Sequence, residues 1–222
     1  MIKAKQKPIA EIREMLAPFH KVLILGCGTC VTISFAGGEK EVGLLASSLR
    51  IAEAMAGNAK TFAEATVQRQ CEWEFLDEVA DEINRADAVL SLACGIGVQA
   101  LAERYPDKVI LPGVNTTFLG MAVEHGVLVE RCRACGDCVL GQTAGICPIA
   151  RCAKNLLNGP CGGSQEGKCE VNPELDCAWQ LIYDRLQRLG TLDRLNRFQP
   201  PKDWSKDYDG GPRKIVREDL KL

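Results

Sequence analysis

The sequence predicts an α/β domain with a mostly parallel sheet, followed by a cysteine-rich module with a helix, and then a tail. Three observations carry this prediction. Short apolar runs alternate with helical patterns through the first 128 residues. Eight of the twelve cysteines crowd into the segment that follows, and the last residues are rich in proline, glycine and charge. We therefore expect three parts, which cover residues 1–128, 129–196 and 197–222.

The first part begins with the apolar run KVLIL, which ends in the turn sequence GCGTC. Helical spacing that closes at a glycine follows it, and the strand-then-helix order recurs along the chain. This alternation is typical of a parallel sheet with helices on its faces, in a Rossmann- or flavodoxin-like fold. Strands are expected at residues 21–25, 61–67, 87–93 and 108–113, and helices at 41–57, 72–86 and 97–105.

Four cysteines follow the first three apolar runs: Cys27, Cys30, Cys71 and Cys94. In a parallel sheet these positions share the carboxyl edge, where ligands bind, and neighbouring strands are only about 4.8 Å apart. The positive ends of the following helices favour thiolates. We expect one shared metal or cluster site there. Because free cysteines are often buried, Cys71 or Cys94 taken singly could instead be core filler.

Other candidate sites in this part are weaker. The turn GCGTC resembles a dinucleotide loop, but G-x-G-x-x-G requires glycine where the chain has Val31. The segment LPGVNTTFLG at 111–120 carries turn residues and two hydroxyls, so it either closes over the first cofactor or forms a turn. His20 and His125 have no partner at a useful spacing. We expect both histidines to be structural and no catalytic residue on the chain.

The second cysteine set carries the stronger signal. CRACGDC has the C-x2-C-x2-C spacing that opens a bacterial ferredoxin motif, and ICPI supplies a Cys-Pro pair. Zinc also accepts four thiolates, but a zinc ribbon shows a second C-x2-C pair, and the later cysteines of this set, from Cys147 to Cys177, form none. We expect [4Fe-4S] clusters, two or three in the whole chain, with zinc at one site as the alternative. The set comprises Cys132, Cys135, Cys138, Cys147, Cys152, Cys161, Cys169 and Cys177.

The grouping of these eight ligands stays open at this point. Eight residues separate Cys138 from Cys147, where a ferredoxin has three. In two-cluster ferredoxins the cysteine before proline binds the other cluster. Cys147 is therefore not assigned to the same cluster as the three cysteines before it.

Composition excludes several classes of protein. The net charge of −2 offers no basic surface for a nucleic acid. The N-terminal residues lack the apolar core of a signal peptide, and no apolar run approaches the roughly 18 residues of a membrane span. We expect a cytoplasmic protein, whose thiols stay reduced, so a disulfide framework is disfavoured.

The C-terminal segments contain one more predicted helix, at residues 172–190. Asn172 suits its cap, Pro173 its first turn and Gly190 its end. The tail at 197–222 cannot bury much surface alone. It is expected to be either a solvated tail or an arm on another subunit, with Trp204 and Tyr208 as anchors.

The motifs GCGTCVT, ACGIGVQ, LPGVNTTFLG, CRACGDCVL, GICPIARCAK, LLNGPCGGSQEGKCEV and DCAW resemble the MetV-type family, the methylenetetrahydrofolate reductase C-terminal domain. The resemblance covers about residues 21–189 and is most specific from NGPCGG to GKCEV. It implies an iron-sulfur subunit that passes electrons to the FMN of a TIM-barrel partner. That partner would reduce methylenetetrahydrofolate to methyltetrahydrofolate in the Wood-Ljungdahl pathway, and further subunits could donate the electrons.

Two alternatives to an electron-transfer subunit remain. A zinc-stabilised structural subunit would hold a reductase complex together and carry no electrons. A flavodoxin-like module would bind its own FMN. This chain has too few predicted strands for an eight-stranded barrel, which usually takes about 250 residues.

Overall fold

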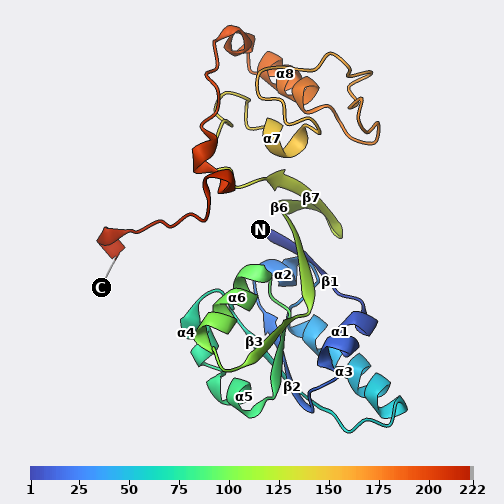
Figure 1. Cartoon of the computed structure of the whole chain (residues 1–222). Coiled ribbons are helices and arrows are strands. Elements are labelled where there is room, and N and C mark those ends of the chain that lie inside the picture. Colours follow the sequence, from blue (N-terminus) through green and yellow to red (C-terminus); the bar gives the residue numbers. More distant parts are fainter. Residues whose placement is uncertain (221–222) are drawn as a thin grey trace. The chain divides into compact units, whose positions relative to one another are not determined.

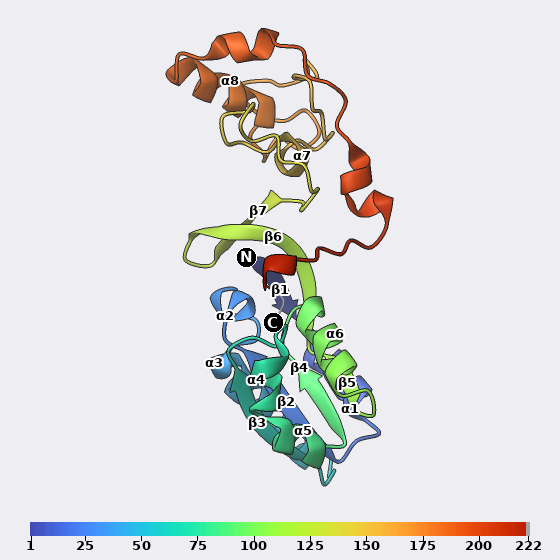
Figure 2. The same ribbon diagram turned by 90° about the vertical axis from the view of Figure 1, so that its left-hand side faces the viewer.

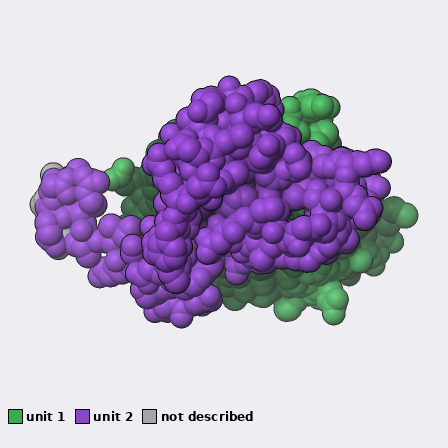
Figure 3. Space-filling model, turned by 90° about the horizontal axis from the view of Figure 1, so that it is seen from above, with its two compact units in different colours: residues 1–128 green, residues 129–222 purple. Residues whose placement is uncertain are grey.

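The computed structural model describes residues 1–220. The chain divides into two compact units, the first Met1–Leu128 and the second beginning at Val129 (Figures 1 and 3). Each unit is described by itself below. No helix in the described part of the chain is both long and apolar enough to cross a membrane.

The first unit is built on a four-stranded parallel sheet, which confirms the predicted α/β class. All three neighbouring pairs run parallel, in the order β3-β2-β4-β5. The chain therefore adds β3 on one side of β2 and then crosses to the other side for β4. The boundary between β2 and β4 is a topological switch point, the usual place for a ligand in such a sheet. The strands are β2 (Lys21–Cys27), β3 (Thr61–Val67), β4 (Ala88–Ser91) and β5 (Val109–Pro112).

Helices cover both faces of this sheet (Figure 1). Along β2, Ile24 faces the core formed with α1 and α3, whereas Leu25 faces the core formed with α4, α5 and α6. Burial on both faces explains why the strand reads as a continuous apolar run. The helices are α1 (Ile9–Leu16), α2 (Cys30–Ile33), α3 (Glu39–Met55), α4 (Trp73–Asp77), α5 (Ala80–Arg85) and α6 (Gly95–Arg104).

Two predicted elements of this unit differ from the structure. The single helix expected at 72–86 is two short helices, because the backbone leaves the helical conformation at Val79. The segment LPGVNTTFLG is more than a turn, although its Thr116 hydroxyl accepts from the Gly95 N–H at 2.8 Å, next to Cys94. It ends β5, turns at Gly113 and then begins the long strand β6. A Cβ at Gly113 would lie 2.3 Å from the Leu92 side chain, so this position has room only for glycine.

A second, three-stranded sheet has the order β1-β6-β7 and was not predicted from the sequence. β1 pairs antiparallel with β6, so residues more than 100 positions apart become neighbours. β7 runs out of the first unit and ends at the first cysteine of the second set. The strands are β1 (Ile2–Gln6), β6 (Val114–Glu124) and β7 (Val127–Cys132).

The second unit is mostly irregular chain around one longer helix (Figure 2). Its hydrophobic core cluster is small and comprises Trp179, Ile182 and Leu186, all on α8, and Ile149 and Ala178 are buried as well. Its regular elements are α7 (Pro148–Arg151), α8 (Ala178–Arg188) and the short 3-10 helices η1 (Leu192–Asn196), η2 (Trp204–Lys206), η3 (Tyr208–Gly210) and η4 (Glu218–Leu220).

The helix expected at 172–190 begins later, at Ala178, with Cys177 as its cap. The predicted cap, Asn172, instead closes a turn: its side-chain oxygen accepts from the Glu174 N–H, and its carbonyl accepts from the Leu175 N–H. Asparagine forms such turns readily, so it signals a turn as well as a helix cap. The predicted end agrees with the structure. The helix α8 ends at Arg188, and Gly190 follows with a positive φ of 64°.

Candidate cysteine metal centres

The strand-end cysteines lie where three segments of the first unit meet. Cys27 is the last residue of β2, and Cys30 begins α2 three residues later. Cys71 follows β3, and Cys94 caps α6 after β4. Cys27 and Cys94 are buried, whereas Cys71 is exposed. Because β2 and β4 are neighbours, this arrangement gathers the cysteines beside the switch point.

A buried glutamine holds these strand ends together. Gln70 is fully buried and donates from Nε2 to the carbonyls of Leu25 and Gly26, at 2.8 and 3.0 Å. Its Oε1 accepts from Ser91 Oγ at 2.6 Å. Gln70 thus ties the segment before Cys71 to the ends of β2 and β4. No sequence pattern indicated this role beyond a polar residue next to a cysteine.

Electrostatics indicate that the strand-end thiols influence one another. The pKa of Cys71 is raised, first by partial removal of its thiol from water and then by the charge of neighbouring Cys27 and, more weakly, of Cys94. Thiolates that repel one another in this way need a positive group between them if all are to ionise. A bound metal or cluster supplies such a charge.

Lys3 adds an unsatisfied positive charge to the same unit. It is 1% exposed, and its ammonium has no hydrogen-bond partner among residues 1–220. Its strand, β1, packs against α2, which begins at Cys30. Burying an unpaired charge is costly. An anionic cluster on the strand-end cysteines would bring the opposite charge to this part of the unit, so the residues present fit such a group.

In the second unit, four cysteines from separate segments line one small cavity. Cys152 follows α7, Cys161 lies in the NGPCGG loop, Cys169 lies in the GKCEV turn and Cys177 caps α8. Lys154, Ser164, Glu170, Ala178 and Trp179 complete the lining. The structure therefore places four of the eight cysteines around one cavity. The sequence had left this grouping open. Cys147 lies outside this group.

Backbone groups around this cavity favour the thiolate form of its ligands. The pKa of Cys169 is lowered, first by hydrogen bonds from the backbone N–H groups of Val171 and Asn172, and less by Lys154. Gly163 N–H donates to Cys161 Sγ at 3.5 Å. Cys177 lies at the N-terminus of the 11-residue helix α8, whose dipole also favours a negative charge. Thiolates are the form that binds metals.

The ligand geometry bears on which metal suits the chain. In the described part of the chain, no three His, Cys, Asp or Glu side chains are placed to hold a single metal ion. A tetrahedral zinc site requires Zn–S distances of about 2.3 Å from all its ligands. In a [4Fe-4S] cluster each cysteine binds a different iron, so the four sulfurs lie farther apart. Four cysteines that line one cavity match either group in number.

The C-x2-C-x2-C loop forms a separate feature at the end of β7. Ala134 and Gly136 have positive φ angles of 56° and 78°, which turn the chain between the cysteines. Ala134 N–H donates to Cys132 Sγ at 3.3 Å. Cys132 and Cys138 are exposed and Cys135 is partly buried. Two of the three cysteines of the loop are therefore exposed, and a backbone N–H of the loop donates to one of them.

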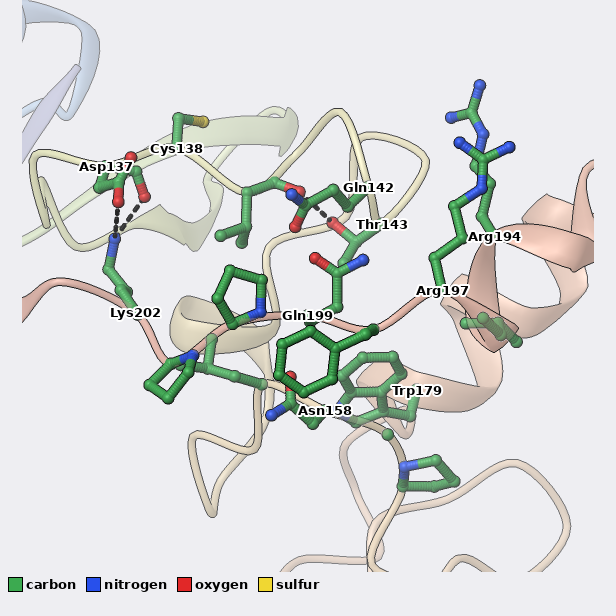
Figure 4. A pocket seen from close by; sticks show the side chains of 18 residues that line it. Asp137, Cys138, Gln142, Thr143, Asn158, Trp179, Arg194, Arg197, Gln199 and Lys202 are labelled. Carbon is green, nitrogen blue, oxygen red and sulfur yellow. Dashed lines mark hydrogen bonds and ion pairs between the residues drawn. The ribbon is translucent and has the colours of Figure 1, made fainter.

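A larger cavity of about 570 Å³ lies beside this loop (Figure 4). Cys138 lines one end and Trp179 another, and residues 197–202 of the tail form a wall. Trp179 also lines the four-cysteine cavity, and its indole N–H donates to the Leu156 carbonyl at 2.9 Å. This buried indole therefore lies between Cys138 and the other four cysteines. Apart from its place in the DCAW motif, no sequence pattern indicated that Trp179 lines both cavities.

The two histidines lie away from any such arrangement. His125 packs edge-on against Phe35, with ring centroids 5.2 Å apart. The backbone N–H of His20 donates to the Asp87 carboxylate at 3.0 Å. These contacts give neither imidazole a catalytic partner, in line with the structural role expected of both.

Comparison with known proteins identifies the cysteine-rich segment. Residues 111–205 match a family described as methylene-tetrahydrofolate reductase C terminal. The match confirms the resemblance to the MetV-type family and includes all eight cysteines of the second set. The strand-end cysteines lie outside it. No curated protein and no solved structure matches the chain.

Proposed function

We propose that this chain is the iron-sulfur electron-transfer subunit of a methylenetetrahydrofolate reductase. One observation carries the proposal: Cys152, Cys161, Cys169 and Cys177 line a single cavity inside the segment that matches the reductase family. Backbone N–H groups lower the pKa of Cys169, and the Gly163 N–H donates to Cys161 Sγ. The ferredoxin-like C-x2-C-x2-C spacing in the same unit favours [4Fe-4S] clusters over a single ion.

The twelve cysteines then form three groups of four. The strand-end group is Cys27, Cys30, Cys71 and Cys94; the second is Cys132, Cys135, Cys138 and Cys147; the third lines the small cavity. When bound, [4Fe-4S] clusters accept and release single electrons. The protein's part is to hold the thiolates, to donate hydrogen bonds to sulfur and to limit access of water.

The partner in this proposal is a TIM-barrel subunit with FMN, on which methylenetetrahydrofolate is reduced to methyltetrahydrofolate. Two features support this division of labour. The described residues form a parallel sheet of only four strands, whereas a barrel needs eight. The turn after β2 has valine in place of the third glycine of a dinucleotide loop. The chain would therefore supply electrons and leave the folate chemistry to the partner.

A zinc-stabilised structural subunit is the second candidate, since four thiolates also suit structural zinc. Elemental analysis of anaerobically purified protein separates the two. We expect about 8 to 12 iron atoms per chain, with similar acid-labile sulfide, for two or three clusters. Zinc with neither iron nor sulfide would overturn the electron-transfer proposal. An isolated chain with bound FMN would instead support a flavodoxin-like module.

A further inference from the structure

The tail of the second unit is fastened to the C-x2-C-x2-C loop of its own chain. Lys202 Nζ donates to the Asp137 carbonyl, and Arg213 Nη1 donates to the Ala134 carbonyl at 2.8 Å. The same guanidinium donates to the Lys206 carbonyl at 3.0 Å. The tail is therefore attached to the loop on either side of Cys135. The sequence predicted either a solvated tail or an arm on another subunit, and neither prediction included these contacts.

The fit between tail and loop is close at Gly136. A Cβ there would lie 2.2 Å from the Lys206 carbonyl oxygen, which is well inside van der Waals contact. Gly136 also has a φ of 78°, which side chains other than glycine rarely adopt. Both the backbone angle and the contact with the tail therefore require glycine between Cys135 and Cys138.

The tail also brings positive charge to the cysteines. The Lys202 side chain is only 2% exposed, and its ammonium lies 3.9 Å from the Asp137 carboxylate. Lys206 Nζ lies 3.7 Å from that same carboxylate. With Arg213 the tail supplies three cations, and Asp137 is the only acidic residue between Cys132 and Cys138. Asp203 also lies near Lys202 and Lys206, so two carboxylates face the three cations.

We propose that Lys202 and Arg213 are positioning residues for the loop cysteines, and that Lys202 raises the reduction potential of the cluster these cysteines hold. The inference rests on the proposed function. Reduction adds a negative charge to a cluster, and a nearby buried cation stabilises that charge. Because the ammonium of Lys202 is shielded from water and anchored to a backbone carbonyl, its effect is screened little by solvent.

The first test is a redox titration of the full-length chain, followed by electron paramagnetic resonance. Lys202→Met keeps the apolar stem but removes the charge. For one cluster we expect the reduced-to-oxidised ratio at a fixed potential to fall about tenfold, which equals about 59 mV for one electron. Lys202→Arg should restore most of the ratio. Arg217→Gln is the control, because Arg217 pairs with Asp219 within the tail and not with the loop.

The second test does not depend on a redox titration: hydrogen exchange of the loop amides in the full-length chain as purified anaerobically. Lys202→Met and Arg213→Gln should each speed exchange at residues 133–137, whereas Arg217→Gln should not. Equal exchange in all variants would overturn the positioning role. Unchanged potentials in Lys202→Met would overturn the charge effect. A wild-type chain without iron would refute the proposed function and, with it, the effect on the reduction potential. The exchange data would still show whether Lys202 and Arg213 hold the tail against the loop.

Discussion

Gln70 and Ser91 are joined by a hydrogen bond of 2.6 Å between two fully buried side chains. The same glutamine donates to the carbonyls of Leu25 and Gly26. One side chain therefore fixes the distances between the ends of β2, β3 and β4. Those are the segments that carry Cys27, Cys71 and Cys94. The positions of these three cysteines relative to one another therefore depend on Gln70, which is not one of the predicted ligands.

Replacing Gln70 with leucine should destabilise the first unit. The change keeps the volume but removes the acceptor of the buried Ser91 hydroxyl and one donor to each of the Leu25 and Gly26 carbonyls, of which Leu25 keeps the Leu92 N–H. The expected loss in the free energy of unfolding is about 2–4 kcal/mol, because each buried unsatisfied group costs about 1–3 kcal/mol. Denaturant unfolding measures it. Gln68→Leu is the matched control, since Gln68 is exposed, and an equal loss in both variants would contradict the role given to Gln70.

Removing a strand-end cysteine should empty one centre only. In Cys94→Ala we expect the loss of about four iron atoms per chain, because a [4Fe-4S] cluster seldom survives without a ligand. Cys169→Ala should empty the centre in the second unit by the same amount. Iron analysis of both single variants and of the double variant tests whether the losses add. Unchanged iron in both Cys94→Ala and Cys71→Ala would rule out a strand-end cluster.

Cluster binding should supply much of the folding free energy of the second unit. Its hydrophobic core cluster holds just Trp179, Ile182 and Leu186 among the described residues, and small metallo-domains commonly unfold without their metal. Limited proteolysis followed by mass spectrometry should show cleavage between residues 132 and 177 in chelated protein. Residues 1–128 should survive the same treatment. Equal resistance with and without iron would show that the unit folds without its clusters.

An ion pair in the first unit should make its stability depend on pH. The pKa of Glu53 is lowered, first by the hydrogen bond from Arg13 and then by that from Asn58. Its contribution is therefore present above the ordinary pKa of a glutamate and is lost as the pH falls through the lowered value. Glu53→Gln should cost about 1 kcal/mol at pH 7 and little at pH 3.

Unfolding curves of the Glu53→Gln variant at both pH values provide the measurement. Glu103→Gln is the control, because Glu103 is exposed on α6 and should show no pH-dependent difference from wild type. A loss of stability in Glu53→Gln that is the same at pH 3 and pH 7 would mean that the carboxylate charge is not responsible.

The isolated chain should accept electrons without reducing the folate. We expect dithionite to bleach its visible absorption, while methylenetetrahydrofolate stays unchanged until a flavin-bearing barrel subunit is added. The reason is that the chain carries no flavin site in the proposed division of labour. Coupled assays with and without the second subunit check this. Turnover of the folate by the purified chain alone would show that the active site lies here.

Local sequence patterns predicted the parallel strands well. The run at 61–67 matches β3 residue for residue, because an apolar run bounded by turn residues depends on its own side chains. The antiparallel sheet escaped prediction for the opposite reason. β1 is short, and its partner β6 lies over 100 residues away, so no local pattern could reveal the pairing. The late start of α8 reflects the two conformations open to Asn172.

The sequence by itself determined which segments form the parallel sheet and which family the cysteine-rich segment resembles, and it predicted cysteine thiolates as the ligands. These features depend on residue type and local spacing. Only the tertiary structure decided that β2 lies beside β4, that Cys152, Cys161, Cys169 and Cys177 share a cavity, and that the tail is fastened to the loop at Ala134 and Asp137. Contacts between segments that are distant in the chain depend on how the whole chain packs. The spacing of residues along the sequence does not specify which of these segments become neighbours.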